Sequence, residues 1–255
     1  MKILAIEASG AVAGAAVTEN GVLRAEITLN HKMTHSQTLM PIIDEIKRYL
    51  DLDIKSIDYI ACSAGPGSFT GLRIGSATAK GLGLALKKPL IHVPTLDAMA
   101  YNLYGTSALI CPMMDARRNQ VYTGVYRFEQ EFETVMEPCM MDTRELAREL
   151  NKYGERVILL GDGVPVNAQI LKENLEVPFS FAPAQCSRQR GASVAVLGAV
   201  YFTEGKTETA MEHKPDYLRK AQAERELEEA KRQGKVAELA AGHSVGDGSQ
   251  REGKA

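Results

Sequence analysis

Residues 2–29, with the sequence KILAIEASGAVAGAAVTENGVLRAEITL, contain three short apolar runs separated by glycine turns. Each run has the length and apolar content of a β-strand. The glycines fall where the chain must reverse, and glycine tolerates the backbone conformations that tight turns require. The stretch therefore predicts a three-stranded antiparallel sheet, with strands at residues 2–8, 15–18 and 22–29.

Helices and strands alternate in the part of the chain that follows this sheet. Apolar residues at helical spacing indicate helices, and short valine- and isoleucine-rich runs indicate buried strands. Three strands followed by helix, strand, helix, strand and helix resemble one half of the actin-like ATPase (ASKHA) fold, which contains two such halves. The expected elements are a helix at 36–50, a strand at 57–63, a helix at 72–86, a strand at 90–93 and a helix at 95–104.

A second half is expected to start near residue 106. Strand-like runs at 108–113 and 121–128 flank a turn, and a helix near 143–153 precedes a strand at 156–160. We therefore expect an α/β chain with a duplicated two-lobe fold. Its parts would be an N-terminal lobe over 1–105, completed by a helix within about 190–220, a smaller lobe over 106–189, and a charged, partly disordered tail over 226–255.

Composition excludes several classes of protein. The chain has 255 residues, of which 45% are hydrophobic and 24% charged, as in ordinary globular proteins. A net charge of −2 supplies no basic field for nucleic acid. The four cysteines form no CxxC pair, which argues against a zinc knuckle and a disulfide framework. Glu7 interrupts the first apolar run too early for a signal peptide, so a cytoplasmic location is expected.

Residues 65–71 (GPGSFTG) form a glycine-rich loop between an expected strand and an expected helix. Backbone N–H groups at such a place can bind an anion, and Ser68 would be a contact. The loop lacks the lysine of a P-loop, and its glycine spacing does not fit a dinucleotide fingerprint. A structural turn without a ligand is therefore the favoured interpretation.

The helix after this loop carries small residues at every fourth position, namely Gly71, Gly75, Ala79 and Gly83. Each interior glycine costs a helix about 1 kcal/mol relative to alanine, so some contact must offset this cost. Tight packing on the chain's own sheet and docking of a helix from another subunit both remain open. The docking interpretation predicts an apolar interface made by Leu39, Ile43, Ile46, Leu50, Leu72, Gly75, Ala79, Leu82 and Gly83.

Several segments closely resemble the TsaB (YeaZ) family, and the resemblance extends from the N-terminus to about residue 225. The most specific are SAGPGSFTGLRIG at 63–75 and DARRNQVY at 115–122. Three others are ILAIEAS at 3–9, the His35-Ser36 pair, and PDYLRKAQAER at 215–225.

The resemblance implies a role in forming N6-threonylcarbamoyladenosine beside the anticodon of tRNA. It implies a non-catalytic scaffold and activator that dimerises with a TsaD-like threonylcarbamoyl transferase, with a TsaE-like ATPase as a further partner. It also implies that tRNA is reached only through the complex, that the isolated chain can form a homodimer, and that no membrane is involved.

The residues that bind metal and ATP in related proteins are replaced in this sequence. In the catalytic relatives two metal-binding histidines follow a KPLI-like strand, and the matching positions here are Thr95 and Met99. Glu7 stands where ATP-binding relatives carry an aspartate, and residues 115–118 (DARR) replace a glycine-rich phosphate turn. Only residues 161–163 (GDG) keep a trace of an adenosine-binding loop. We expect degenerate nucleotide-site elements, with no catalytic residue, metal or cofactor.

Two residue pairs leave alternatives open. His31 and His35 have metal-ligand spacing, but a supporting role for His35 at a helix start is favoured. Arg117 and Arg118 could contact an anion or nucleotide, and pairing with an internal acid such as Asp115 is slightly favoured. The alternative functions are an actin-like ATPase or kinase and a metal-dependent transferase that acts on its own.

Overall fold

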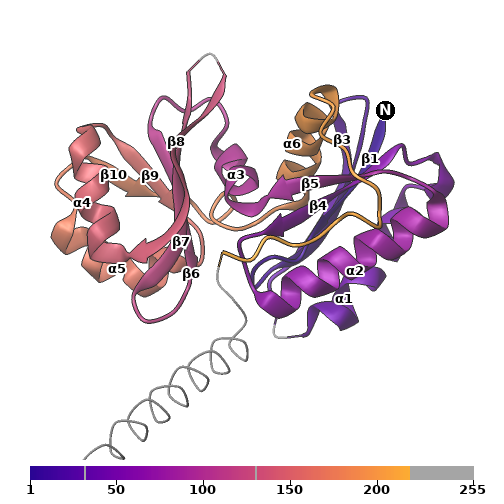
Figure 1. Cartoon of the computed structure of the whole chain (residues 1–255), viewed down its shortest axis with the longest axis horizontal. Helices are drawn as coiled ribbons and strands as arrows, with labels where there is room; N and C mark the ends of the chain where they lie inside the picture. The colour runs from indigo at the N-terminus through magenta and orange to yellow at the C-terminus, as the bar shows by residue number, and fades with distance from the viewer. Residues whose placement is uncertain (32, 130, 219–255) are drawn as a thin grey trace, which may run out of the picture. The chain divides into compact units, whose positions relative to one another are not determined.

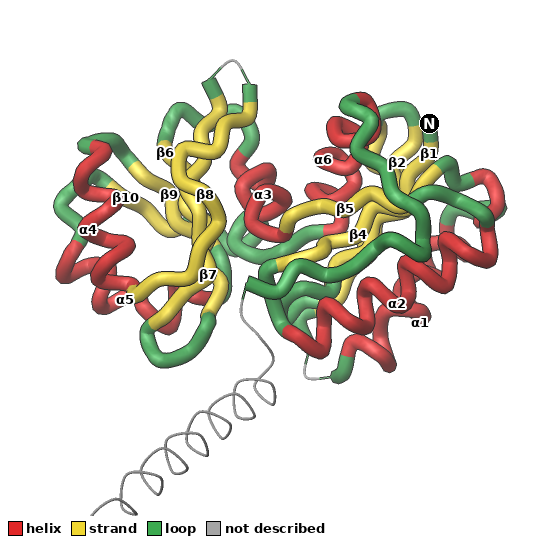
Figure 2. The backbone as a smooth tube through the Cα atoms, in the orientation of Figure 1, coloured by secondary structure: helices red, strands yellow, loops and turns green. Residues whose placement is uncertain are grey.

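The structure is a computed structural model, and it describes residues 1–31, 33–129 and 131–218 (Figure 1). The expected tail at 226–255 lies outside the described residues. Two five-stranded sheets carry helices along their faces (Figure 2). Among the residues that are described, no helix combines the length and the apolar character needed to cross a membrane.

The first sheet confirms the antiparallel start that the sequence predicts. β1 pairs antiparallel with β2 and parallel with β4, and the strand order is β3-β2-β1-β4-β5. β1 and β4 are buried on both faces, as their apolar runs require. The bounds are β1 Lys2–Glu7, β2 Ala13–Glu19, β3 Val22–Leu29, β4 Tyr59–Gly65 and β5 Leu90–Pro94.

Three helices cover this sheet. α1 (His35–Tyr49) and α2 (Phe69–Leu86) lie side by side on one face, and α6 (Gly191–Thr203) lies on the other (Figure 1). Gly198 brings α6 close to β4, because a Cβ there would lie only 2.8 Å from the Cβ of Ala61. The late helix thus packs on the first sheet, across a long gap in sequence.

The second sheet repeats the topology of the first. Its order, read from β8, is β8-β7-β6-β9-β10, which corresponds strand by strand to β3-β2-β1-β4-β5. The duplicated actin-like fold is therefore confirmed, although α5 and β10 were not expected from the sequence. The bounds are β6 Leu109–Asp115, β7 Gln120–Phe128, β8 Phe132–Asp142, α4 Thr143–Tyr153, β9 Val157–Leu160, α5 Gly163–Asn174 and β10 Phe179–Phe181.

Asp97 links elements that belong to different sheets. It lies on α3 (Thr95–Ala100) and accepts hydrogen bonds from the hydroxyls of Tyr126 on β7, at 2.8 Å, and Tyr201 on α6, at 2.9 Å. Burial raises the pKa of Asp97, and the two tyrosine bonds partly counter that shift. Contacts group residues 1–218 into a single compact unit, so the division into lobes near residue 105 stays a prediction.

The predicted docking residues do not form an exposed surface, and that prediction is wrong. Most of them are buried, because each helix has a single apolar side and directs it toward its own sheet. Leu50 and Leu82 are partly buried against the same core. A Cβ at Gly75 would lie 3.1 Å from the Cβ of Ala8, so the chain itself fills this space. The buried members are Leu39, Ile43, Ile46, Leu72, Gly75, Ala79 and Gly83.

Two alanines on α2 test which side of the helix faces the core. We expect Ala79→Leu to lower the free energy of unfolding by about 1–3 kcal/mol, because Ala79 is fully buried and a larger side chain overpacks the core. Ala77→Leu, at an exposed position two residues away, should change it by less than about 0.5 kcal/mol. Urea unfolding of both variants measures the difference. Equal losses in the two variants would contradict this packing.

Candidate functional site

The exposed sides of α1 and α2 form the first candidate site, which we call the outer face. On α2 this face contains Arg73, Ala77, Gly81 and Leu84, spaced so that they follow one line along the helix. A Cβ at Gly81 would meet nothing within 4 Å. Packing within the chain therefore gives no reason for a glycine at this interior helix position.

The α1 part of the outer face mixes apolar and charged groups. Met40 is 48% exposed and Tyr49 is 70% exposed. The guanidinium of Arg48 lies 4.4 Å from the centroid of the Tyr49 ring and pairs with Glu45 at 2.5 Å. With Leu84 on α2, these two side chains give the outer face its large exposed apolar groups.

The glycine loop between β4 and α2 packs against the chain's own backbone. A Cβ at Gly67 would collide with the carbonyl oxygen of Ser9, and one at Gly71 would collide with that of Ala8. Ser68 donates its N–H to Ser9 O at 2.7 Å, and its Oγ accepts the N–H of Gly71 at 3.3 Å as the N-cap of α2. The glycines are thus explained by close packing. Anion contact at Ser68 stays a prediction.

Glu7, at the end of β1, is only 1% exposed. Its Oε1 accepts the N–H and the hydroxyl of Ser9, at 2.7 and 2.5 Å, while Oε2 has no hydrogen-bond partner among the described residues. Burial raises the pKa of Glu7, and the bonds from Ser9 oppose that rise. A carboxyl held in this way is not presented to solvent, where a nucleotide's metal ion would need it.

Arg117 and Arg118 lie in the turn between β6 and β7. With Asn119 they adopt left-handed backbone conformations, with φ of 66°, 55° and 59°. Asp115 accepts the backbone N–H of Arg117 at 2.8 Å, and no ion pair of either guanidinium is found within the described residues. The expected internal pairing with Asp115 is therefore not observed. Both arginines are exposed on this turn, and positive φ angles are common in turns that join antiparallel strands. Their contact with an anion stays a prediction.

The remaining sequence-derived candidates have structural roles. Thr95 is buried, and its Oγ1 accepts the N–H of Gly65 at 3.2 Å, while Met99 is buried in the core beside β6. His35 Nε2 lies 2.9 Å from the carbonyl oxygen of Gly10, which agrees with its supporting role at the start of α1. Each of the three thus has a contact within its own chain.

The loop at residues 161–163 is filled by its own chain. A Cβ at Gly161 would collide with the carbonyl oxygen of Met113, and Arg188 donates to Gly161 O at 2.8 Å. Asp162 accepts the N–H of Asp115 at 3.2 Å, and burial raises its pKa. Residues 161–163, which resemble part of an adenosine-binding loop, are thus in contact with their own chain.

Sequence reasoning missed a cluster of His92, Glu208 and His213. His92 is more than a hundred residues away from the other two, so spacing alone could not join them. The available signal was a short segment with four chelating side chains, Glu208, Glu212, His213 and Asp216. No part of the docking or anion predictions included this region.

Comparisons with known proteins identify the family. The family model described as TsaD, tRNA N6-adenosine threonylcarbamoyltransferase, matches residues 23–227. The tRNA threonylcarbamoyladenosine biosynthesis protein TsaB of Bacillus subtilis (strain 168) is 32% identical over 230 residues, which cover 88% of this chain and 96% of that protein. The TsaB protein of Escherichia coli (strain K12) is 28% identical over 229 residues, which cover 86% and 95%.

A solved structure agrees with these sequence matches. YeaZ from Pseudomonas aeruginosa superposes with a TM-score of 0.73 at 22% identity, covering 85% of this chain and 99% of that chain. At this level of identity the likeness shows a shared fold. Taken together with the sequence matches over most of the chain, it leads to one assignment: the chain belongs to the TsaB (YeaZ) family.

Proposed function

We propose that this chain is a non-catalytic scaffold and activator subunit in N6-threonylcarbamoyladenosine modification of tRNA. It would dimerise with a TsaD-like threonylcarbamoyl transferase through the outer face of α1 and α2. A TsaE-like ATPase would be a further partner, and tRNA would be reached through the complex. The names of the B. subtilis and E. coli relatives support the pathway, and the geometry of the outer face supports the mode of action.

The observation that carries the proposal is the pair of small-residue stripes on α2. The buried stripe, which includes Gly75 and Ala79, is accounted for by contacts with the chain's own core. The exposed stripe, Ala77 and Gly81, has no such account, since Gly81 faces open space. A glycine that weakens a helix by about 1 kcal/mol is explained if the backbone of another helix packs against it.

The partner's fold determines the form of the interface. A TsaD-like subunit that shares the actin-like fold would offer an equivalent pair of helices, so the contact would resemble a two-fold dimer. The same outer face would then support a homodimer of the isolated chain. Exposed Met40, Tyr49 and Leu84 would supply the apolar area, and the charged residues around them would form the rim.

The residues near the ends of the strands support the proposal of a subunit that performs no reaction step itself. Glu7 is buried under Ser9, and Thr95 and Met99 belong to the core. Arg117 and Arg118 are the residues that we propose for contact with an anionic group, such as a phosphate of tRNA bound to the complex, because they are exposed at a fixed turn. That contact would assist binding and would perform no reaction step.

Gly81→Trp tests the proposed interface. We expect this variant to weaken binding of the TsaD-like subunit by at least 10-fold, about 1.4 kcal/mol, because the indole blocks close approach of the partner helix. The monomer should stay folded, since the position is open to solvent and tryptophan is a better helix residue than glycine. Calorimetric titration of the partner measures the affinity, and thermal unfolding measures the fold.

Gln169→Trp, at an exposed position on α5, is the matched control and should bind the partner normally. A second comparison, Gly81→Ala, should raise the free energy of unfolding of the monomer by about 1 kcal/mol. Full-strength binding by the Gly81→Trp variant would refute docking at this face.

Glu7→Gln tests whether Glu7 is a buried, passive group. Because its pKa in the folded chain is raised above the ordinary value of 4.5, the wild type loses stability as pH rises through that raised pKa. Glutamine keeps an acceptor for Ser9 and carries no charge. We therefore expect the stability of the variant relative to wild type to increase as pH rises above the ordinary carboxyl pKa of 4.5, as measured by chemical unfolding.

Glu176→Gln, at an exposed carboxyl outside the sheet, serves as the control and should show no comparable trend. A stability difference for Glu7→Gln that does not change with pH would show that Glu7 does not titrate as a buried group. ATP turnover by the isolated wild type that disappears in the variant would favour the ATPase alternative instead.

A further inference from the structure

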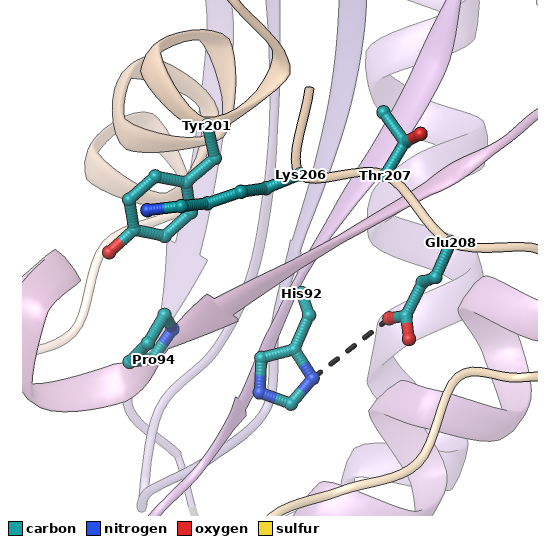
Figure 3. A pocket seen from close by; sticks show the side chains of 6 residues that line it. All are labelled: His92, Pro94, Tyr201, Lys206, Thr207 and Glu208. Atoms are coloured by element: carbon teal, nitrogen blue, oxygen red, sulfur yellow. Dashed lines mark ion pairs between the residues drawn. The ribbon is translucent and has the colours of Figure 1, made fainter. Parts of the chain in front are cut away.

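Three metal-binding side chains meet at the free edge of the first sheet. His92 lies on β5, and Glu208 and His213 lie on the segment that follows α6. One ligand atom from each of the three lies within 4.8 Å of the others. Figure 3 shows His92 and Glu208 facing one another, with His92 Nδ1 3.9 Å from Glu208 Oε1. His213 Nδ1 lies 2.5 Å from the same oxygen.

The backbone holds this cluster in place without any ion. Leu90 and Glu208 form a two-way backbone bridge, with N–O distances of 2.9 and 3.0 Å. Lys80 donates from α2 to the carbonyl oxygen of His213 at 3.1 Å, and Asp216 donates its N–H to Ala64 O at 2.6 Å. The segment is thus fixed to β5, α2 and β4, so the ligands need little ordering to bind.

A carboxylate contacts the ring nitrogen of His92 that faces away from Glu208, as is common for histidines that bind metals. Asp216 Oδ2 lies 2.8 Å from His92 Nε2, which orients the ring and leaves Nδ1 on the side of Glu208. Carboxylates that bond the outer nitrogen of a ligating histidine fix its tautomer and raise its basicity. His213 is 1% exposed, and its Nε2 has no hydrogen-bond partner among the described residues.

We propose that His92, Glu208 and His213 bind one divalent transition-metal ion, with Zn²⁺ as the best match. Two imidazoles and one carboxylate are a known ligand set for zinc with an open fourth position. That position would face the pocket of about 350 Å³ drawn in Figure 3. The pocket is lined by His92, Pro94, Tyr201, Lys206, Thr207 and Glu208.

Binding requires one small rearrangement. The short contact between His213 and Glu208 is a hydrogen bond, and a metal ion would take the place of its proton. The proton would move from Nδ1 to Nε2 of the same ring, so that the imidazole binds the metal as a neutral group, and the carboxylate would shift to make room. The bound ion would clamp the segment after α6 to β5. This role is structural and independent of the proposed scaffold function.

Calorimetric titration of the full-length chain, stripped of metal with a chelator, tests the proposal. We expect one equivalent of Zn²⁺ to bind with a Kd below about 1 µM, and Mg²⁺, which prefers oxygen ligands, not to bind. The bound zinc should also raise the Tm, because it binds the folded state selectively. Asp216→Asn should weaken zinc binding by about 10- to 100-fold, because the ring of His92 loses the carboxylate that orients it.

His92→Gln and Glu208→Gln remove ligands that are only partly buried, so both variants are expected to fold and to lose the bound equivalent. His31→Gln, an exposed histidine elsewhere, is the matched control and should keep it. The proposal is overturned if the wild type binds no zinc. It is also overturned if both His92→Gln and Glu208→Gln still bind zinc. Loss of zinc binding only on replacing Cys186, a free cysteine, by serine would likewise place the ion elsewhere and overturn it.

Discussion

Direct packing of backbone on backbone at the end of β1 is the constraint from which the first sheet and its helices follow. The loop before α2 rests on the carbonyl oxygens of Ala8 and Ser9, and only glycine at residues 67 and 71 permits this. The contact fixes where α2 begins, and Ser68 caps the helix there. The N–H of Ser68 and one oxygen of the Glu7 carboxyl find their hydrogen-bond partners within this same contact, at Ser9.

α2 carries two sets of small residues on nearly opposite sides of the helix. One set faces inward and lets α2 approach β4 closely, because no large side chain separates them. The other set, Ala77 and Gly81, faces outward, and the glycine lowers helix stability without any compensating contact within the described residues. An interface accounts for the glycine at residue 81 only if the backbone of a partner helix packs against it. Such a contact depends on the shapes of the two surfaces more than on their charges.

Most of the fold could be predicted from the sequence, but the orientation of α2 could not. The three antiparallel strands and the alternation of helices and strands after them were predicted because glycine turns and apolar runs are local signals. The duplication was expected because that succession of elements resembles half of the actin-like fold. Residues two apart on a helix differ by about 200° in direction, so the stripes through Ala77 and Ala79 lie on nearly opposite sides. Both stripes are small, and composition alone therefore could not tell which one faces the core.

The short β10 and the helix α5, which begins at Gly163 and contains Pro165, gave weak local signals and were missed. The cluster around His92 was missed for another reason. Its members meet only because the segment after α6 returns to pair with the edge of β5, and such a long-range contact leaves no periodic trace in the sequence.

Asp97 has a mechanical consequence for a chain that contains two sheets. Its carboxylate joins α3 to β7 and to α6 at the same time, through hydroxyls that approach from different sheets. A rotation of one sheet against the other would break charge-assisted hydrogen bonds worth about 1.5–3 kcal/mol each. Enzymes with paired lobes commonly depend on hinge closure around a ligand. A chain held together in this way resists such motion, so the scaffold function that we propose would present its partner with a surface of constant shape.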